Sequence, residues 1–193
     1  MSDLTLDPTT TALVLIDLQR GIASTATAPH TAGDVIARAT RLARRFRERQ
    51  ATVVLVRVDP GPHWELFPRV AADVPRPMPP GAMPADWAQL VPELGHAPDD
   101  VVVTKHQPGA FFATDLDLQL RRRGIRTIVL GGISTNIGVE ATARVAYEIG
   151  YDQVFVEDAM AAREADLHAH AVTRIFPTLG RVRSTDDVLA ALP

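Results

Sequence analysis

Runs of apolar, β-branched residues alternate along the chain with amphipathic stretches, and this pattern predicts a sheet flanked by helices. The run TALVLIDL at 11–18 shows the first kind of segment, because its apolar positions are continuous rather than alternating. In 31–50, by contrast, the apolar residues recur at helical spacing and form one stripe. The predicted strands are 11–18, 52–58, 100–105, 127–132, 152–158 and a short one at 181–183. The predicted helices are 31–50, 115–123, 137–149 and 164–176.

Continuously apolar strands indicate a sheet that is buried on both faces. Strands that alternate with helices favour parallel pairing, with right-handed crossovers between neighbouring strands. We therefore predict an α/β protein with a three-layer α/β/α, doubly wound and mainly parallel sheet. The length of 193 residues suits one domain spanning 1–193, without an internal repeat or linker.

The segment 59–98, which we call the flap, interrupts the pattern. It holds ten of the fifteen prolines, so a long helix or a central strand is not expected there. Trp64, Phe67, Met78, Met83 and Trp87 give it apolar material to pack, which favours an ordered segment. Two interpretations stay open: the flap covers the active site, or it docks on another subunit.

Composition excludes several classes of function. A net charge of −3 argues against a nucleic-acid partner, and basic clusters such as Arg121 to Arg123 fit solvated helix faces. The longest apolar runs fall far short of the roughly 20 residues of a membrane span, and no signal peptide is evident, so we expect a cytoplasmic protein. Because the chain has no cysteine, disulfides, thiolate metal sites and cysteine nucleophiles are all excluded.

Polar residues follow the predicted strands at the edge where an open parallel sheet binds ligands. Asp17 ends the first strand, Lys105 ends the third, and Gly132, Ile133 and Ser134 leave the fourth. The fold should therefore bring a carboxylate, an ammonium group and a glycine-lined helix start to one edge.

Three segments resemble the isochorismatase-like hydrolases, the superfamily that also holds nicotinamidases and other cysteine hydrolases. They read LVLIDLQ, VVVTKHQPGAFFATDLDLQL and GGISTNIGVEATA, and the resemblance extends from Thr11 to about Leu179. It is closest to a bacterial subgroup that lacks the cysteine and reads GISTNIGVE. The resemblance implies catalytic roles for Asp17 and Lys105, with Gly138 at the position of the nucleophilic cysteine. It also implies a cis peptide bond between Ile133 and Ser134.

Gly138 determines what chemistry the resemblance implies. In the first turn of a helix, a glycine offers backbone N–H donors and space for a carboxylate or enolate oxygen. True isochorismatases also have glycine here and hydrolyse a vinyl ether, which needs no nucleophile. By analogy Asp17 would be the general acid, and Lys105 would bind a substrate carboxylate and influence Asp17. The substrate-binding candidates are Ile133, Ser134, Asn136, Gly138 and Gln107. Ser134 and Asn136 replace a tyrosine and a histidine of isochorismatases.

We therefore expect a hydrolase that acts on a small anionic metabolite without a cysteine nucleophile. The alternative is a non-catalytic ligand-binding or scaffold protein that kept the fold. A third hypothesis gives the role of nucleophile to Ser134 or Thr135, but the sequence places no histidine as their base, and capping of the helix by Thr135 or Asn136 is the simpler interpretation.

Several other polar residues receive structural interpretations. Asp59 and His63 match a metal-binding pattern in nicotinamidases only partly, and two ligands fall short of a zinc shell, so we predict no metal and no cofactor. His168 and His170 are expected at the surface or at an interface. The resemblance implies that Asp158 binds backbone N–H groups near the next helix. Phe111 and Phe112 fit either the wall of the pocket or the core.

A homo-oligomer, a dimer or tetramer, is expected because family members are usually oligomers.

Overall fold

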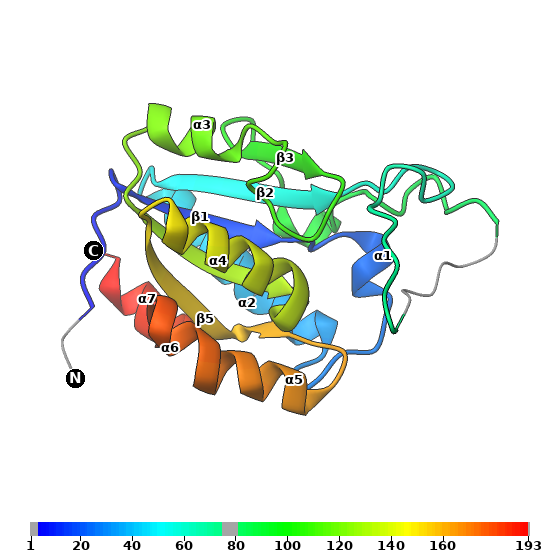
Figure 1. The fold of residues 1–193 in the computed structure, drawn as a ribbon. Helices are drawn as coiled ribbons and strands as arrows, with labels where there is room; N and C mark the ends of the chain where they lie inside the picture. The colour runs from blue at the N-terminus through cyan, green and yellow to red at the C-terminus, as the bar shows by residue number, and fades with distance from the viewer. Residues whose placement is uncertain (1–3, 75–80, 193) are drawn as a thin grey trace.

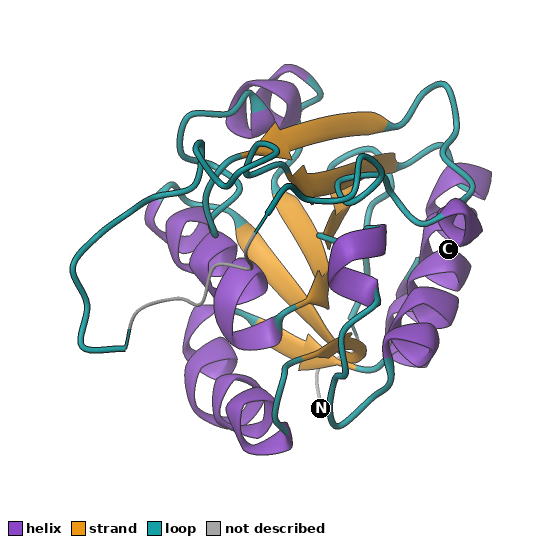
Figure 2. Cartoon of the chain, turned by 90° about the vertical axis from the view of Figure 1, so that its right-hand side faces the viewer, coloured by secondary structure: helices purple, strands orange, loops and turns teal. Residues whose placement is uncertain are grey.

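A six-stranded, all-parallel sheet forms the centre of the protein (Figures 1 and 2). The computed structural model describes residues 4–74 and 81–192. The strand order is β3-β2-β1-β4-β5-β6, so the order reverses between β1 and β4. The strands are β1 (Thr11–Ile16), β2 (Thr52–Val58), β3 (Val101–Lys105), β4 (Thr127–Ile133), β5 (Asp152–Ala161) and β6 (Arg181–Arg183).

Helices cover both faces of this sheet, as Figure 2 shows. They are α1 (Arg20–Ala23), α2 (Ala32–Glu48), η1 (Pro92–Leu94), α3 (Leu116–Arg122), η2 (Thr135–Val139), α4 (Glu140–Glu148), α5 (Ala165–His170), η3 (Ala171–Ile175), α6 (Phe176–Leu179) and α7 (Thr185–Ala191). The three-layer α/β/α arrangement and the parallel sheet were both predicted from the sequence and are confirmed. Among the described residues, no helix is long and apolar enough to cross a membrane.

Two apolar clusters separate the layers, and β1 contributes to both. Leu13 and Leu15 pack with α2 and α7 on one face. Val14 and Ile16 pack with α3, α4 and α6 on the other face. All six residues of β1 are buried, which explains why its sequence is apolar without alternation.

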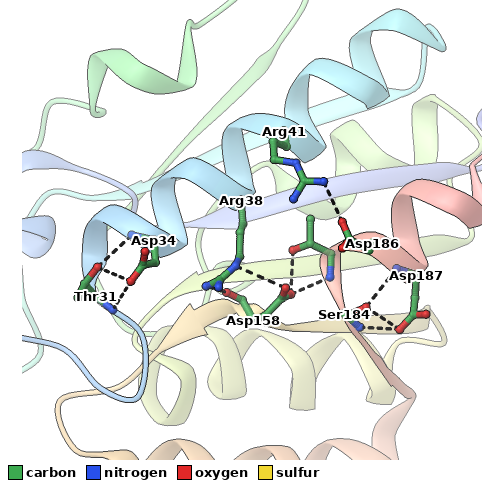
Figure 3. Close-up of polar contacts among 9 residues, drawn as sticks. Thr31, Asp34, Arg38, Arg41, Asp158, Ser184, Asp186 and Asp187 are labelled. Atoms are coloured by element: carbon green, nitrogen blue, oxygen red, sulfur yellow. Dashed lines mark hydrogen bonds and ion pairs between the residues drawn. The ribbon is translucent and has the colours of Figure 1, made fainter.

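The carboxyl end of β5 and helix α7 were not predicted correctly. β5 continues three residues beyond Asp158, and α7 follows β6 without having been expected. Ser184 and Asp187 form a capping box at the start of α7, a local signal that the sequence did contain. Asp158 Oδ1 accepts hydrogen bonds from the N–H and hydroxyl of Thr185 at 2.7 and 2.8 Å (Figure 3). Asp158 therefore binds the last helix rather than the next one, because β5 carries on past it.

Two predicted helices are interrupted by π-helical turns. The helix expected at 137–149 begins at Thr135 with η2, and that at 164–176 is divided into α5, η3 and α6. π turns inside helices are frequent at functional sites. The turn η2 lies directly after β4, at the edge of the sheet where Asp17 leaves β1.

In its described parts, 59–74 and 81–98, the flap has little regular structure and rests on the end of β1. Its backbone joins α1 through hydrogen bonds from the Arg20 N–H to the Gln89 carbonyl and from the Gly21 N–H to the Trp87 carbonyl, both 2.9 Å. Trp64 contacts Phe67 and Trp87 edge-on, with ring centroids 6.0 and 5.8 Å apart. Met78 lies outside the described residues. In Figure 1 the described part of the flap before η1 lies beyond the arrowheads of β1 and β2, whereas η1 packs against α2.

Candidate active site

The reversal of strand order brings the ends of β1 and β4 side by side, which is where open α/β sheets bind ligands. Asp17 follows β1, and its N–H donates to the Val56 carbonyl of β2 at 2.9 Å. Its φ of 54° lies in the left-handed region, which non-glycine residues rarely adopt. Such conformations cluster at functional sites, so the backbone itself marks Asp17.

Asp17 and Lys105 form a buried ion pair, with Lys105 Nζ 3.0 Å from Asp17 Oδ2. Asp17 is 6 % exposed and Lys105 is fully buried. Burial raises the pKa of Asp17 to about 6, although the charge of Lys105 and its hydrogen bond oppose this rise. Burial also lowers the pKa of Lys105. The second carboxylate oxygen, Oδ1, is buried and has no hydrogen-bond partner among the described residues.

Lys105 occupies a different position from the one expected of a substrate-binding group. Its ammonium group donates to Asp17 and to the Pro108 carbonyl, and it does not line the adjacent cavity. The prediction that Lys105 influences Asp17 agrees with this contact. The prediction that Lys105 binds a substrate carboxylate does not fit its complete burial.

Gly138 lies against the ion pair. A Cβ atom at this position would be 3.1 Å from Asp17 Oδ2 and 3.3 Å from Lys105 Nζ. It would also be 2.9 Å from Ile16 Cγ2, closer than real Cβ atoms come. Residues 17, 105 and 138 therefore meet at one point, as the three matched segments implied, and the space at residue 138 is tight.

The turn between β4 and η2 has the expected backbone. The Ile133–Ser134 peptide bond is cis. The preceding Gly132 has φ 125°, and a Cβ atom there would be 2.1 Å from the Ile16 carbonyl oxygen, so only glycine fits. This turn carries Ile133, Ser134 and Asn136 to the cavity beside Asp17.

Thr135 was misinterpreted, and so was His168. The Thr135 hydroxyl lies 2.9 Å from His168 Nδ1, and both residues are buried. Thr135 therefore does not cap the helix, and His168 is not a surface residue. Burial lowers the pKa of His168. Neither residue lines the cavity, so the pair ties η2 to α5 behind it.

Two buried polar side chains near the site were not singled out from the sequence. Gln19 donates to the Val58 carbonyl at 2.9 Å and accepts from the Val58 N–H at 2.8 Å, which fixes the chain after Asp17 to the end of β2. The Thr142 hydroxyl donates to the Gly138 carbonyl at 2.7 Å and accepts from the Ala110 N–H at 3.1 Å. Both lie among other polar residues in the sequence, so no local pattern singles them out.

A cavity of about 790 Å³ adjoins this edge, a size typical of small-molecule sites. Asp17, Ser134, Asn136 and Gly138 line one side. Gln107 also lines it, while its side-chain N–H groups donate to the Gly109 and Phe112 carbonyls. The flap residues that line it are Trp64, Phe67, Val74 and Trp87. The flap thus forms part of the wall of the candidate site.

Three buried polar atoms of the lining residues have no hydrogen-bond partner in the described part of the chain. They are Asp17 Oδ1, Asn136 Oδ1 and Trp64 Nε1. Buried polar groups are usually satisfied, so these atoms point to hydrogen bonds that a ligand would complete. Trp64 also has a left-handed backbone, with φ 61°.

The remaining candidates lie in structural contacts. Asp59 Oδ1 accepts from the Gly61 N–H at 3.0 Å, and the Asp59 carbonyl contacts His106 Nδ1. Within the described residues no group of three or more His, Cys, Asp or Glu could hold a metal ion. Phe111 is a core residue stacked on Tyr151, whereas Phe112 is 76 % exposed. Neither phenylalanine lines the cavity.

Comparison with known proteins identifies related sequences and folds. The family model described as "Isochorismatase domain" matches residues 11–187. The isochorismatase family protein YecD of Escherichia coli O157:H7 is 48 % identical over 189 residues, covering 98 % of this chain and all of YecD. The structure of an isochorismatase family protein from Burkholderia thailandensis superposes with a TM-score of 0.92 at 49 % identity, covering 98 % of each chain.

One further relative carries a named activity. The ureidoacrylate amidohydrolase RutB of Pseudomonas syringae pv. syringae is 33 % identical over 207 residues, covering 95 % of this chain and 84 % of RutB.

Proposed function

Because the chain belongs to the isochorismatase family, whose members are hydrolases, we propose that it hydrolyses a small anionic metabolite by acid–base catalysis at Asp17. No cysteine is present, so a covalent thioester route is excluded. The specific reaction we propose is hydrolysis of a vinyl ether. This reaction starts with protonation of the terminal carbon of the vinyl ether. The reaction requires no nucleophile from the enzyme.

The observation that carries the proposal is the state of the Asp17 carboxyl group. One oxygen, Oδ2, is held by Lys105, and the other, Oδ1, has no hydrogen-bond partner among the described residues, in a side chain that lines the cavity. A pKa of about 6 leaves a useful fraction of the protonated form near neutral pH. An ordinary exposed aspartate, with a pKa near 3.9, would be almost fully ionised there.

The reaction proceeds in two stages. Asp17 transfers its proton to the terminal carbon of the enol ether, which produces an oxocarbenium ion and a carboxylate at Asp17. Water then adds to the oxocarbenium carbon and loses a proton, and the hemiketal collapses to an alcohol and a keto acid. The Asp17 carboxylate recovers a proton from the attacking water, so the enzyme returns to its starting state.

Lys105 and Gly138 support this role without reacting. Lys105 compensates the charge that Asp17 carries after proton transfer, because its ammonium group is 3.0 Å away. Gly138 places no side chain against the ion pair, where a Cβ atom would be 3.1 Å from Asp17 Oδ2 and 3.3 Å from Lys105 Nζ.

The test uses isochorismate, with pyruvate detected by mass spectrometry. We expect pyruvate and the dihydrodiol acid from the wild type. We expect about 10²- to 10⁴-fold less from Asp17→Asn, because the amide cannot donate the proton. Since the acid must be protonated, kcat/KM should fall about tenfold per pH unit above a pKa of about 6. Equal turnover by Asp17→Asn would contradict the proposal.

Two further measurements on the wild type, isochorismate binding and labelling by an activated ester, separate the alternative functions. Binding of isochorismate without product would support the non-catalytic ligand-binding hypothesis. An activated ester that labels Ser134 or Thr135 would support a substitute nucleophile. Thr135 is fully buried and its hydroxyl is engaged by His168, whereas Ser134 lines the cavity, so labelling would have to occur at Ser134.

A further inference from the structure

Few charged groups surround the cavity, and they differ in whether they are already paired. Among the described residues that line it, only Asp17 and Arg163 carry a charge. Asp17 is already compensated by Lys105. Arg163 is exposed, and its guanidinium group makes no hydrogen bond or ion pair with any residue in the described ranges 4–74 and 81–192. It is therefore the cation of this cavity that is free to bind a ligand.

The backbone on which Arg163 stands is fixed. The preceding residue, Ala162, is fully buried and exchanges two hydrogen bonds of 2.9 Å with Ala28 in an isolated antiparallel bridge. This bridge joins the end of β5 to the loop that carries Ala26 and Thr27, which also line the cavity. Arg163 thus extends from an anchored position at the wall of the cavity.

From this arrangement we propose that Arg163 is the specificity-determining residue that binds the carboxylate of the substrate. The inference rests on the proposed function and deepens it, because it names the group that selects an anionic substrate. A guanidinium group binds a carboxylate with two parallel hydrogen bonds, which favours a carboxylate over an uncharged amide. Lys105, which the sequence suggested for this role, is buried and engaged by Asp17.

The charges also determine how the substrate lies. A substrate carboxylate placed beside Asp17 would be repelled by the negative charge that Asp17 acquires when it gives up its proton. The substrate therefore directs its carboxylate to Arg163 and its reacting bond to Asp17. Among the described lining residues, the indole N–H of Trp64 and the amide oxygen of Asn136 are also unsatisfied and can bind other polar atoms of the substrate.

Binding measurements test this without any need for turnover. We would titrate the wild type with a panel of small carboxylates, namely benzoate, acrylate and pyruvate, and with the carboxamide of each, by ligand-observed NMR. We expect the wild type to bind at least one carboxylate about tenfold more tightly than its amide. Arg163→Gln should lose this preference, with binding of the amide unchanged.

Controls separate this inference from the proposed function. Arg174→Gln removes an exposed arginine that lies outside the cavity and should leave the preference intact. Asp17→Asn should abolish turnover of isochorismate but keep the preference for carboxylates, because Arg163 is unchanged. The inference is overturned if Arg163→Gln retains the preference, if it weakens carboxylate and amide equally, or if the wild type prefers no carboxylate of the panel. Failure of isochorismate turnover alone would overturn the proposed reaction and not the role of Arg163.

Discussion

At the scale of single residues, the site depends on close packing between Asp17, Lys105 and Gly138, which are far apart in the sequence. Lys105 binds Asp17 Oδ2, Asp17 Oδ1 has no hydrogen-bond partner in the described part of the chain, and the Gly138 backbone packs closely against both side chains. The pKa of Asp17 results from two opposing effects, the burial that raises it and the Lys105 charge that lowers it. A change at either neighbour should therefore be visible at Asp17.

Lys105→Met should raise the pKa of Asp17 above about 6, because the variant loses the attraction that favours the carboxylate. If Asp17 must be protonated to act, the fall of kcat/KM with rising pH should move to higher pH. The carbon NMR shift of the Asp17 carboxyl group, followed from acid to alkaline pH, measures the same pKa without turnover. A pKa that is unchanged or lower would show that Lys105 does not control Asp17.

Gly138→Ala should lower the free energy of unfolding by about 1 kcal/mol, since overpacking a filled core costs more than a helical alanine gains. The new Cβ would be 2.9 Å from Ile16 Cγ2, a buried side chain on β1. Gly33→Ala in α2 is the matched control, because its Cβ would have 3.7 Å to its nearest neighbour. In urea unfolding the control should become more stable by about 0.5 kcal/mol. Stabilisation of both variants would contradict the tight contact at residue 138.

At the scale of elements, the π turn η2 connects the sheet to the site. It follows the cis peptide bond at the end of β4 and is tied to α5 by Thr135 and His168. This link joins residues that are 33 positions apart in the sequence. It holds the turn that presents Ser134 and Asn136 to the cavity.

Thr135→Val should destabilise the protein by about 1–3 kcal/mol, because it leaves a buried histidine nitrogen without a partner. Thr135→Ser keeps the hydroxyl and is the control, and it should retain most of the stability. Urea unfolding at neutral pH, where His168 is uncharged because burial lowers its pKa, measures the difference. If valine were tolerated as well as serine, the hydrogen bond would not be holding the turn.

At the scale of the whole molecule, the homo-oligomer expected from the family stays a prediction. The flap exposes apolar side chains, including Leu66 at 51 % and Val70 at 79 %. Exposed apolar patches often mark interfaces between subunits. Light scattering at micromolar concentration should show a dimer or tetramer.

If the flap forms the subunit interface, the double variant Leu66→Ser, Val70→Ser should shift the dimer or tetramer towards monomer. Val102→Ser changes an exposed apolar residue on β3, outside the flap, and is the control. A monomeric wild type would contradict the prediction of an oligomer. An unaffected double variant would place the interface elsewhere.

The sequence by itself determined the fold class, the strands and the meeting of Asp17, Lys105 and the glycine-lined helix start at one edge, while the family resemblance implied the place of Gly138. It could do so because continuous apolar runs report burial on both faces, and a parallel sheet brings all its carboxyl ends to one edge. Local patterns also placed most element boundaries within a few residues, but they missed α1, η1, α7 and the extension of β5. Helix α7 has a capping signal, but its seven residues are too few to show a helical period.

Only the tertiary structure decided how the polar groups are paired. It buried Lys105 completely and joined Thr135 to His168, and within the described ranges it left Arg163 and Asp17 Oδ1 without a partner. These outcomes depend on which atoms are withdrawn from water and on contacts between segments far apart in the chain. Sequence periodicity reports which face of an element is buried, but it does not report which partner a buried polar atom finds.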